Sequence, residues 1–207
     1  IHEAPESTYK PIKREVAKAR IQNKYKISGR FILYIGGFSP RKNLRGLINA
    51  YHKIYKEMKT PCQLVILGKP SRDYPGLIKL VESLGLQEWV LFPGFIPMQD
   101  LPFFYNACDL FVYPSFYEGF GLPPIEALAC GTPTIVSNVS SLPEVVGDAA
   151  IQVNPHDLLA LAATMHRVLT EPELVQELRK KGIKRAENFS WTKTAAQTIK
   201  VYQEVLG

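Results

Sequence analysis

Two features of the sequence predict its fold class. Short, nearly continuous apolar runs alternate along most of the chain with segments that carry apolar residues at helical spacing. Strands that are apolar throughout are typical of a parallel sheet buried on both faces. The prediction is therefore an α/β fold, a Rossmann-like parallel sheet with helices on both faces. Right-handed crossovers place the strand-to-helix loops at one edge, where ligands bind.

The expected elements follow one another in a regular order. Strands are predicted at 31–36, 63–68, 89–92, 110–113 and 134–137, and helices at 44–58, 77–84, 99–107 and 123–130. The first of these helices carries its apolar residues at Leu44, Leu47, Ile48, Tyr51 and Ile54, which is the period of one helix face. The loops 36–43, 68–74, 94–98, 113–123 and 137–141 are expected at the ligand-binding edge.

The chain of 207 residues fits one domain with a sizeable core. Residues 1–27 are interpreted as a linker and first helix, residues 28–154 as the α/β core and residues 155–207 as a helical tail. The tail is expected to hold helices at 158–169, 172–184 and 192–206, with Trp191 buried as an anchor between the last two. Because the first residue is Ile1 rather than Met, we expect a fragment or a processed product.

Composition excludes several classes of protein. No stretch approaches the ~20 apolar residues of a membrane span, and no signal peptide is visible. The three cysteines, Cys62, Cys108 and Cys130, lack CxxC spacing and stand in apolar contexts, so we expect buried thiols, no disulfide and no zinc. The expected location is a reducing compartment, the cytoplasm, with the inner face of the membrane left open.

The formal net charge of +6 is concentrated near the N-terminus. Residues 1–60 hold fourteen Lys and Arg against four Asp and Glu. Between Lys10 and Lys26 the basic residues alternate with apolar ones at helical spacing, which indicates mostly a solvated helix face rather than a nucleic-acid surface. We expect no nucleic acid as a partner, whereas contact with an anionic membrane stays open.

The most informative segment is 118–126, with the sequence Glu-Gly-Phe-Gly-Leu-Pro-Pro-Ile-Glu. A glycine turn follows an apolar strand and leads into a helix that opens with Pro123 and Pro124. Such a turn directs free amide groups and the positive end of a helix dipole at one point, which is typical of a phosphate site.

Two glutamates stand at the ends of this segment. Glu118 precedes the turn, and Glu126 is expected in the opening turn of the helix. A diphosphate would repel both carboxylates, so we expect them to accept from neutral hydroxyls, Glu118 from a sugar and Glu126 from a ribose. A nucleotide sugar has hydroxyls on both sides of a diphosphate. The alternative is a solvated loop residue and a charge that complements the helix dipole.

The spacing Glu-(x)7-Glu, within EGFGLPPIEALACGTPTIVS, resembles the signature of retaining glycosyltransferases of family 4, the glycosyl transferases of group 1. The resemblance runs from about residue 28 to the last helix. It implies the C-terminal, donor-binding half of a two-domain GT-B enzyme, whose last helix crosses toward an N-terminal domain absent here. The implied activity is transfer of a hexose from a GDP-mannose or UDP-glucose type of donor to a glycan or lipid-linked acceptor, as in polysaccharide biosynthesis.

The resemblance also assigns roles to residues. Glu118, Arg41 and Lys42 would be catalytic, the two cations stabilising the diphosphate leaving group. The other donor-binding residues would be Gly36, Gly37, Phe95, Ile96, Gly119, Phe120, Gly121, Leu122 and Glu126. Many family members carry arginine where this chain has Gly37, so Arg41 and Lys42 would bear more of the diphosphate charge. Phe95 could equally belong to the core.

The resemblance implies no cofactor and no required metal, and the sequence has no DxD motif. The chain alone is expected to bind donor and turn over little, because the acceptor site lies in the N-terminal domain. Two alternatives remain at this point: a non-catalytic nucleotide-sugar-binding module and a sugar-nucleotide epimerase of related architecture. A dinucleotide site, suggested by the Gly36-Gly37 pair, lacks the GxGxxG pattern.

Overall fold

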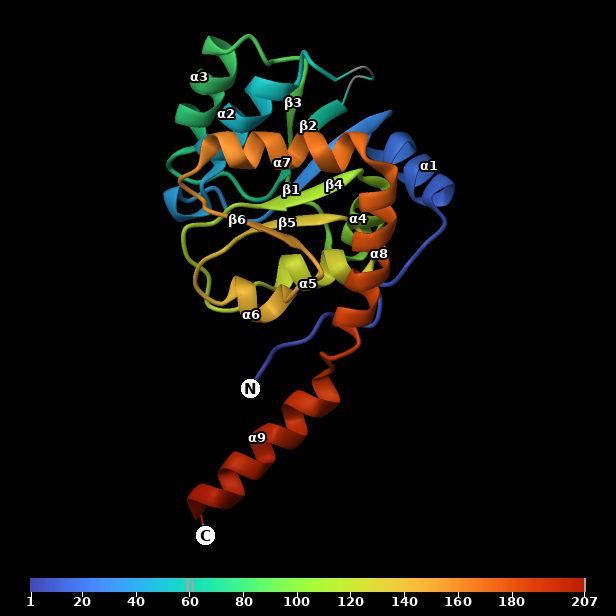
Figure 1. Cartoon of the computed structure of the whole chain (residues 1–207), viewed down its shortest axis with the longest axis vertical. Helices are drawn as coiled ribbons and strands as arrows, with labels where there is room; N and C mark the ends of the chain where they lie inside the picture. The colour runs from blue at the N-terminus through green and yellow to red at the C-terminus, as the bar shows by residue number, and fades with distance from the viewer. Residues whose placement is uncertain (59, 61, 207) are drawn as a thin grey trace.

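The computed structural model describes residues 1–58, 60 and 62–206, so Gly207, the last residue of the expected tail, lies outside it. Its centre is a six-stranded parallel sheet in the order β3-β2-β1-β4-β5-β6 (Figure 1). The strands are β1 (Arg30–Ile35), β2 (Cys62–Leu67), β3 (Val90–Gly94), β4 (Leu110–Tyr113), β5 (Thr134–Ser137) and β6 (Ile151–Val153). The predicted α/β class with a parallel sheet is confirmed.

Helices cover both faces of this sheet (Figure 1). One layer contains α2 (Leu44–Ile54), α3 (Tyr74–Ser83) and α7 (Leu158–Thr170). The other contains α1 (Arg14–Tyr25), α4 (Leu101–Ala107), α5 (Leu122–Ala129), α6 (Leu142–Val146) and α8 (Pro172–Ala186). Short 3-10 turns, Pro40–Lys42 and Met98–Asp100, precede α2 and α4.

The strand order reverses between β1 and β4. From β1 the chain moves outward through β2 to β3, then returns to place β4 on the other side of β1, with Ile32 opposite Leu110. Both strands are buried along almost their whole length, which explains their nearly continuous apolar sequences. In sheets of this kind the crevice at the reversal point, beyond the carboxyl ends of the strands, is the usual ligand site.

Two elements were not predicted, and several boundaries shifted, including the start of α3, which is Tyr74 instead of residue 77. Helix α6 and strand β6 escaped prediction because they are only 5 and 3 residues long. Helix α2 ends at Ile54 instead of 58, and the helix expected at 99–107 begins as a 3-10 turn before α4.

The helical tail contains three helices, as predicted, but Trp191 is not a buried anchor. It begins α9 (Trp191–Leu206), and 47% of its surface is exposed. Helix α9 contains no buried residue and projects away from the body of the domain (Figure 1). Its exposed apolar side chains include Ile199, Tyr202 and Leu206.

The basic segment near the N-terminus is more than a solvated helix face. Helix α1 packs on α4, and Arg20 and Lys24 bind the fully buried carboxylate of Asp100 at 2.8 and 2.5 Å. Burial opposes the charged form of Asp100, but hydrogen bonds from Lys24, Tyr25 and Arg20 prevail and lower its pKa to about 2. Part of the positive charge of α1 therefore fastens this helix to the core.

Candidate functional site

Two loops meet beyond the carboxyl ends of β1 and β4. Asn43, in the left-handed conformation at φ 55°, donates from Nδ2 to the carbonyl oxygens of Pro114 at 3.1 Å and Pro155 at 2.9 Å. The amide of Phe116 donates to the Arg41 carbonyl at 2.9 Å. These contacts fix the loop of residues 36–43 against the loop of residues 114–121.

The joined loops bring together Glu118, Lys42, Arg41 and Tyr113, of which Arg41 is exposed and the other three are largely buried. Glu118, only 7% exposed, accepts from Lys42 Nζ at 2.6 Å and from Arg41 Nη1 at 3.2 Å. Lys42 Nζ lies 2.7 Å from the Tyr113 hydroxyl, and Arg41 also donates to the carbonyl of Tyr117 at 2.9 Å. The three residues predicted as catalytic therefore lie together, although 76 positions separate Lys42 from Glu118. Glu118 thus pairs with both cations and carries charge for only one of them.

The glycine turn leads from this cluster into α5. Gly121 has φ +111° at the N-cap, and a Cβ there would lie 2.8 Å from Leu142 Cδ2, so glycine is required. In the part of the chain that the structure describes, the amide groups of Phe120, Gly121 and Leu122 have no hydrogen-bond acceptor. Free amides at a helix N-terminus are suited to an anion.

A pocket of about 620 Å³ opens above this turn. It contains several predicted residues, Gly36, Lys42, Glu118, Gly119, Phe120, Gly121 and Leu122. Tyr113, Pro123 and the N-terminal residues Ile1 and Glu3 complete its lining. Arg41 is not part of the lining, although it pairs with Glu118. Lys42 beside a row of free amides gives the pocket the chemistry of a phosphate site.

Glu126 does not line this pocket. It lies in the second turn of α5, because the helix begins at Leu122 and has no acidic residue in its first turn. Its Oε2 accepts from the buried Tyr105 hydroxyl at 2.8 Å, and burial raises its pKa. The hydroxyl of Tyr9 is buried beside it; burial first, and then the charge of Glu126, raises the pKa of Tyr9.

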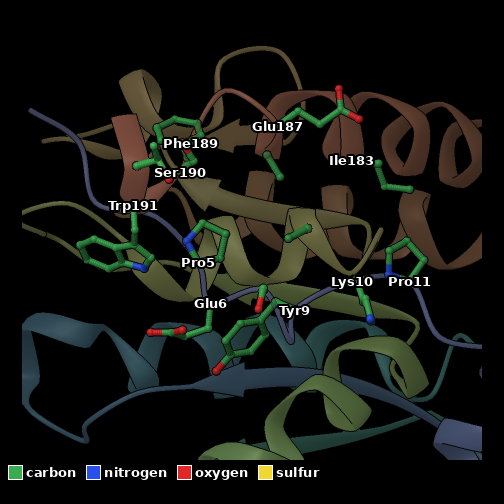
Figure 2. Close-up of a pocket in the computed structure, with 14 residues that line it drawn as sticks. Pro5, Glu6, Tyr9, Lys10, Pro11, Ile183, Glu187, Phe189, Ser190 and Trp191 are labelled. Atoms are coloured by element: carbon green, nitrogen blue, oxygen red, sulfur yellow. The ribbon is translucent and has the colours of Figure 1, made fainter. Parts of the chain in front are cut away.

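Tyr9 belongs to a separate pocket of about 510 Å³ between the N-terminal segment and the junction of α8 with α9. Figure 2 shows Pro5 and Tyr9 on the N-terminal segment, with Phe189 and Trp191 on the other side. The N-terminal segment thus runs past α5 and places the Tyr9 hydroxyl beside Glu126.

In the turn predicted to contact the base, Phe95 and Ile96 differ in burial. Phe95 is 62% exposed and does not belong to the core, whereas Ile96 is 4% exposed and packs into it. Lys69 Nζ lies 5.1 Å from the centre of the Phe95 ring. Gly37 lies outside the pocket lining, and its carbonyl accepts from the Tyr34 hydroxyl at 3.0 Å.

Three residues of the site were not predicted. Tyr113 contacts Lys42, the Ser140 hydroxyl accepts from the Glu118 amide at 3.0 Å, and the Ser141 hydroxyl lies 3.0 and 2.7 Å from the carbonyls of Glu118 and Phe120. The signal for the serines was present, since residues 137–141 follow the next strand at the same edge. Ser140 at φ 55° shows how tightly this loop turns.

Other expectations concern metals, membranes and thiols. The described residues contain no group of three or more His, Cys, Asp or Glu side chains that could hold a metal ion. No helix within them is long and apolar enough to cross a membrane. Cys62, Cys108 and Cys130 are buried, as predicted, and burial is the main reason that their pKa values are raised.

The parallel sheet with helices on both faces and a reversal of strand order places the chain in the broad class of doubly wound α/β domains. Comparison with known protein families gives a more specific assignment. The model of the family described as glycosyl transferases group 1 matches residues 16–185, so the chain belongs to this family. The O-antigen chain mannosyltransferase B of Escherichia coli is 40% identical over 184 residues, which are 88% of this chain and 48% of that protein. The MMP alpha-(1->4)-mannosyltransferase of Mycolicibacterium hassiacum is 33% identical over 185 residues, 87% and 44% of the two chains.

Solved structures agree on the fold. Sucrose-phosphate synthase from Thermosynechococcus elongatus superposes with a TM-score of 0.85 at 29% identity, over 99% of this chain and 51% of that one. The C-terminal domain of a glycosyl transferase group 1 family protein from Francisella tularensis superposes with a TM-score of 0.78 at 25% identity. The match covers 89% of this chain and 97% of that one. The chain is thus a C-terminal GT-B domain, as the motif predicted. It spans about half the length of the two curated relatives named above and less than a quarter of the serotype-specific mannosyltransferase WbdA of Escherichia coli.

Proposed function

We propose that this chain is the donor-binding half of a retaining hexosyltransferase of family 4, and that the pocket above α5 receives the diphosphate of a nucleotide sugar. The observation that carries the proposal is the cluster of Lys42, Arg41 and Glu118 beside the free amides of the glycine turn. The cations supply two positive charges for a group that carries at least two negative ones. Several relatives are named mannosyltransferases, which favours GDP-mannose over UDP-glucose as donor.

The chemistry assigned to the site is cleavage of the bond between the anomeric carbon and the diphosphate oxygen. Both electrons of that bond stay on the oxygen, and the carbon passes through an oxocarbenium-like state before it bonds to the acceptor oxygen. The proton of the acceptor hydroxyl passes to the departing diphosphate. Lys42, Arg41 and the turn amides stabilise the charge that grows on the leaving diphosphate. Glu118, released from the cations, accepts from a hexose hydroxyl. Glu126 is assigned to the ribose, once the N-terminal segment leaves its carboxylate accessible.

The complete enzyme is proposed to contain an N-terminal GT-B domain that binds a glycan or lipid-linked acceptor, in polysaccharide assembly at the cytoplasmic side of the membrane. Helix α9, with its exposed apolar side chains, is proposed to cross onto that domain. No metal is required in this scheme, since protein groups neutralise the diphosphate.

Thermal unfolding of the chain with GDP, UDP and ADP in parallel tests the proposal. A nucleotide at one hundred times its dissociation constant adds about 2.7 kcal/mol to the free energy of unfolding. One nucleotide is expected to raise the Tm, and the double variant Arg41→Ala, Lys42→Ala is expected to lose that increase. The control is Arg167→Ala, which removes an exposed cation that pairs with Glu171 on the surface. An increase that survives in the double variant would refute the diphosphate site.

Two other functions are distinguished in the two-domain enzyme. A non-catalytic binding module has no use for Glu118, so neither the unmodified protein nor Glu118→Ala would show hexosyl transfer. An epimerase would convert a nucleotide sugar without any acceptor. Loss of hexosyl transfer in Glu118→Ala, with nucleotide binding retained, supports the transferase.

A further inference from the structure

Tyr113 stands at the floor of the pocket and takes no part in the function proposed above. It is the last residue of β4, only 2% exposed, and its ring stacks between Tyr34 and Phe111 at centroid distances of 5.8 and 5.9 Å. Its hydroxyl reaches out of this stack to Lys42 Nζ at 2.7 Å. A rigid strand therefore presents one fixed oxygen to the pocket.

Lys42 needs such a fixed partner. Its ammonium is held by two oxygens, the carboxylate of Glu118 and the hydroxyl of Tyr113, and it also lies 5.0 Å from the centre of the Tyr113 ring. Lysine is a compact charge on a flexible four-carbon chain, so its position depends on what it contacts. When a diphosphate replaces Glu118 as the counter-charge, Tyr113 is the contact that remains.

The protonation of Tyr113 suits this role. Burial raises the pKa of its hydroxyl far above the ordinary value, and the negative charge of Glu118 raises it further, against a smaller opposing effect of Arg41. The hydroxyl thus stays neutral at working pH and does not compete with the diphosphate for the charge of Lys42.

We infer that Tyr113 is a positioning residue that holds the Lys42 ammonium for the diphosphate of the donor. The inference rests on the proposed function, in which Lys42 binds that diphosphate. It predicts that the hydroxyl of Tyr113 acts on ligand binding only through Lys42.

Isothermal titration of the chain with GDP and GMP, and with UDP and UMP, separates this role from a structural one. Four forms are compared: unmodified chain, Tyr113→Phe, Lys42→Met and the double variant. Tyr113→Phe keeps the stacked ring and removes only the hydroxyl. It is expected to weaken the diphosphate roughly fivefold, the effect of about one hydrogen bond, and to change monophosphate binding by less than about twofold. In the Lys42→Met background the same change is expected to have no further effect.

Tyr51→Phe is the matched control. Tyr51 is also fully buried, and its hydroxyl donates to the Cys62 carbonyl at 2.6 Å, away from the pocket. It is expected to leave nucleotide binding unchanged. Equal weakening of monophosphate and diphosphate by Tyr113→Phe, or the same weakening in the Lys42→Met background, would overturn the inference. If Lys42→Met itself leaves diphosphate binding unchanged, the proposed diphosphate site fails and the inference fails with it.

Discussion

Replacing Glu118 by glutamine is expected to lower stability and strengthen nucleotide binding at the same time. The carboxylate is 7% exposed and pairs with Lys42 at 2.6 Å and Arg41 at 3.2 Å. A hydrogen bond to a charged group contributes about 1.5–3 kcal/mol, and the amide keeps an acceptor oxygen but no charge. Without ligand, the free energy of unfolding of Glu118→Gln should therefore fall by about 1–3 kcal/mol.

The same carboxylate opposes a bound diphosphate. Two unit negative charges about 6 Å apart repel by roughly 3 kcal/mol at an effective dielectric constant of 20. Losing even half of this repulsion, about 1.4 kcal/mol, would tighten GDP or UDP binding about tenfold. Hexosyl transfer by the two-domain enzyme should nevertheless be lost, because glutamine is a weaker acceptor for the donor hydroxyl.

Thermal unfolding and isothermal titration measure both effects on the same samples. Glu118→Gln should unfold at a lower temperature without ligand and gain more from saturating GDP or UDP than the unmodified chain. The control is Glu171→Gln, since Glu171 pairs with Arg167 on the exposed surface and such pairs contribute little. Unchanged or weaker nucleotide binding in Glu118→Gln would refute the idea that this carboxylate competes with the diphosphate.

Three further predictions concern the turn, the serine loop and α1. Gly121→Ala should lower the free energy of unfolding by about 1–3 kcal/mol, measured by urea unfolding, and should abolish most nucleotide binding, measured by titration. Gly119→Ala should have a small effect on both, because a Cβ there meets no atom within 4 Å. Ser141→Ala should weaken nucleotide binding about fivefold, because the Ser141 hydroxyl no longer holds the turn. Unchanged binding would show that Ser141 does not support the turn. Asp100 has a folded pKa of about 2, below the ~3.9 of an unfolded chain, so its contribution to stability is present above about pH 4 and is lost as the pH falls toward 2. Urea unfolding across this range should show that Asp100→Asn loses less stability than the unmodified chain as the pH falls. The same pH dependence of stability in both forms would exclude this contribution of Asp100.

The inner strands β2, β1, β4 and β5 could be predicted because they are almost entirely buried and mostly apolar. Strand β6 is different, since it lies at the sheet edge, contains only Ile151–Val153 and exposes Gln152. The position of Trp191 also needed the three-dimensional structure. Large aromatic residues are usually highly buried, but this one opens a helix that leaves the body of the domain.

The site could be predicted in its parts but not in its internal contacts. The glycine turn and the basic loop each had a local signature, and the parallel sheet placed both at one edge. Which side chains pair there depends on the adjacency of β1 and β4, so the contact between Glu118 and Lys42 had no sequence signal. The contact of Glu126 with Tyr105 also had no sequence signal. It depends on how far Glu126 lies from the first residue of α5, which the sequence did not fix.

A crystal structure of the chain with the nucleoside diphosphate that raises its Tm most would test the central claim most directly. The proposed function predicts a β-phosphate within hydrogen-bond distance of Lys42 Nζ and of the turn amides, with the 2.6 Å contact between Lys42 and Glu118 broken. A nucleotide bound elsewhere, with that contact intact, would contradict the assignment of this pocket to the donor.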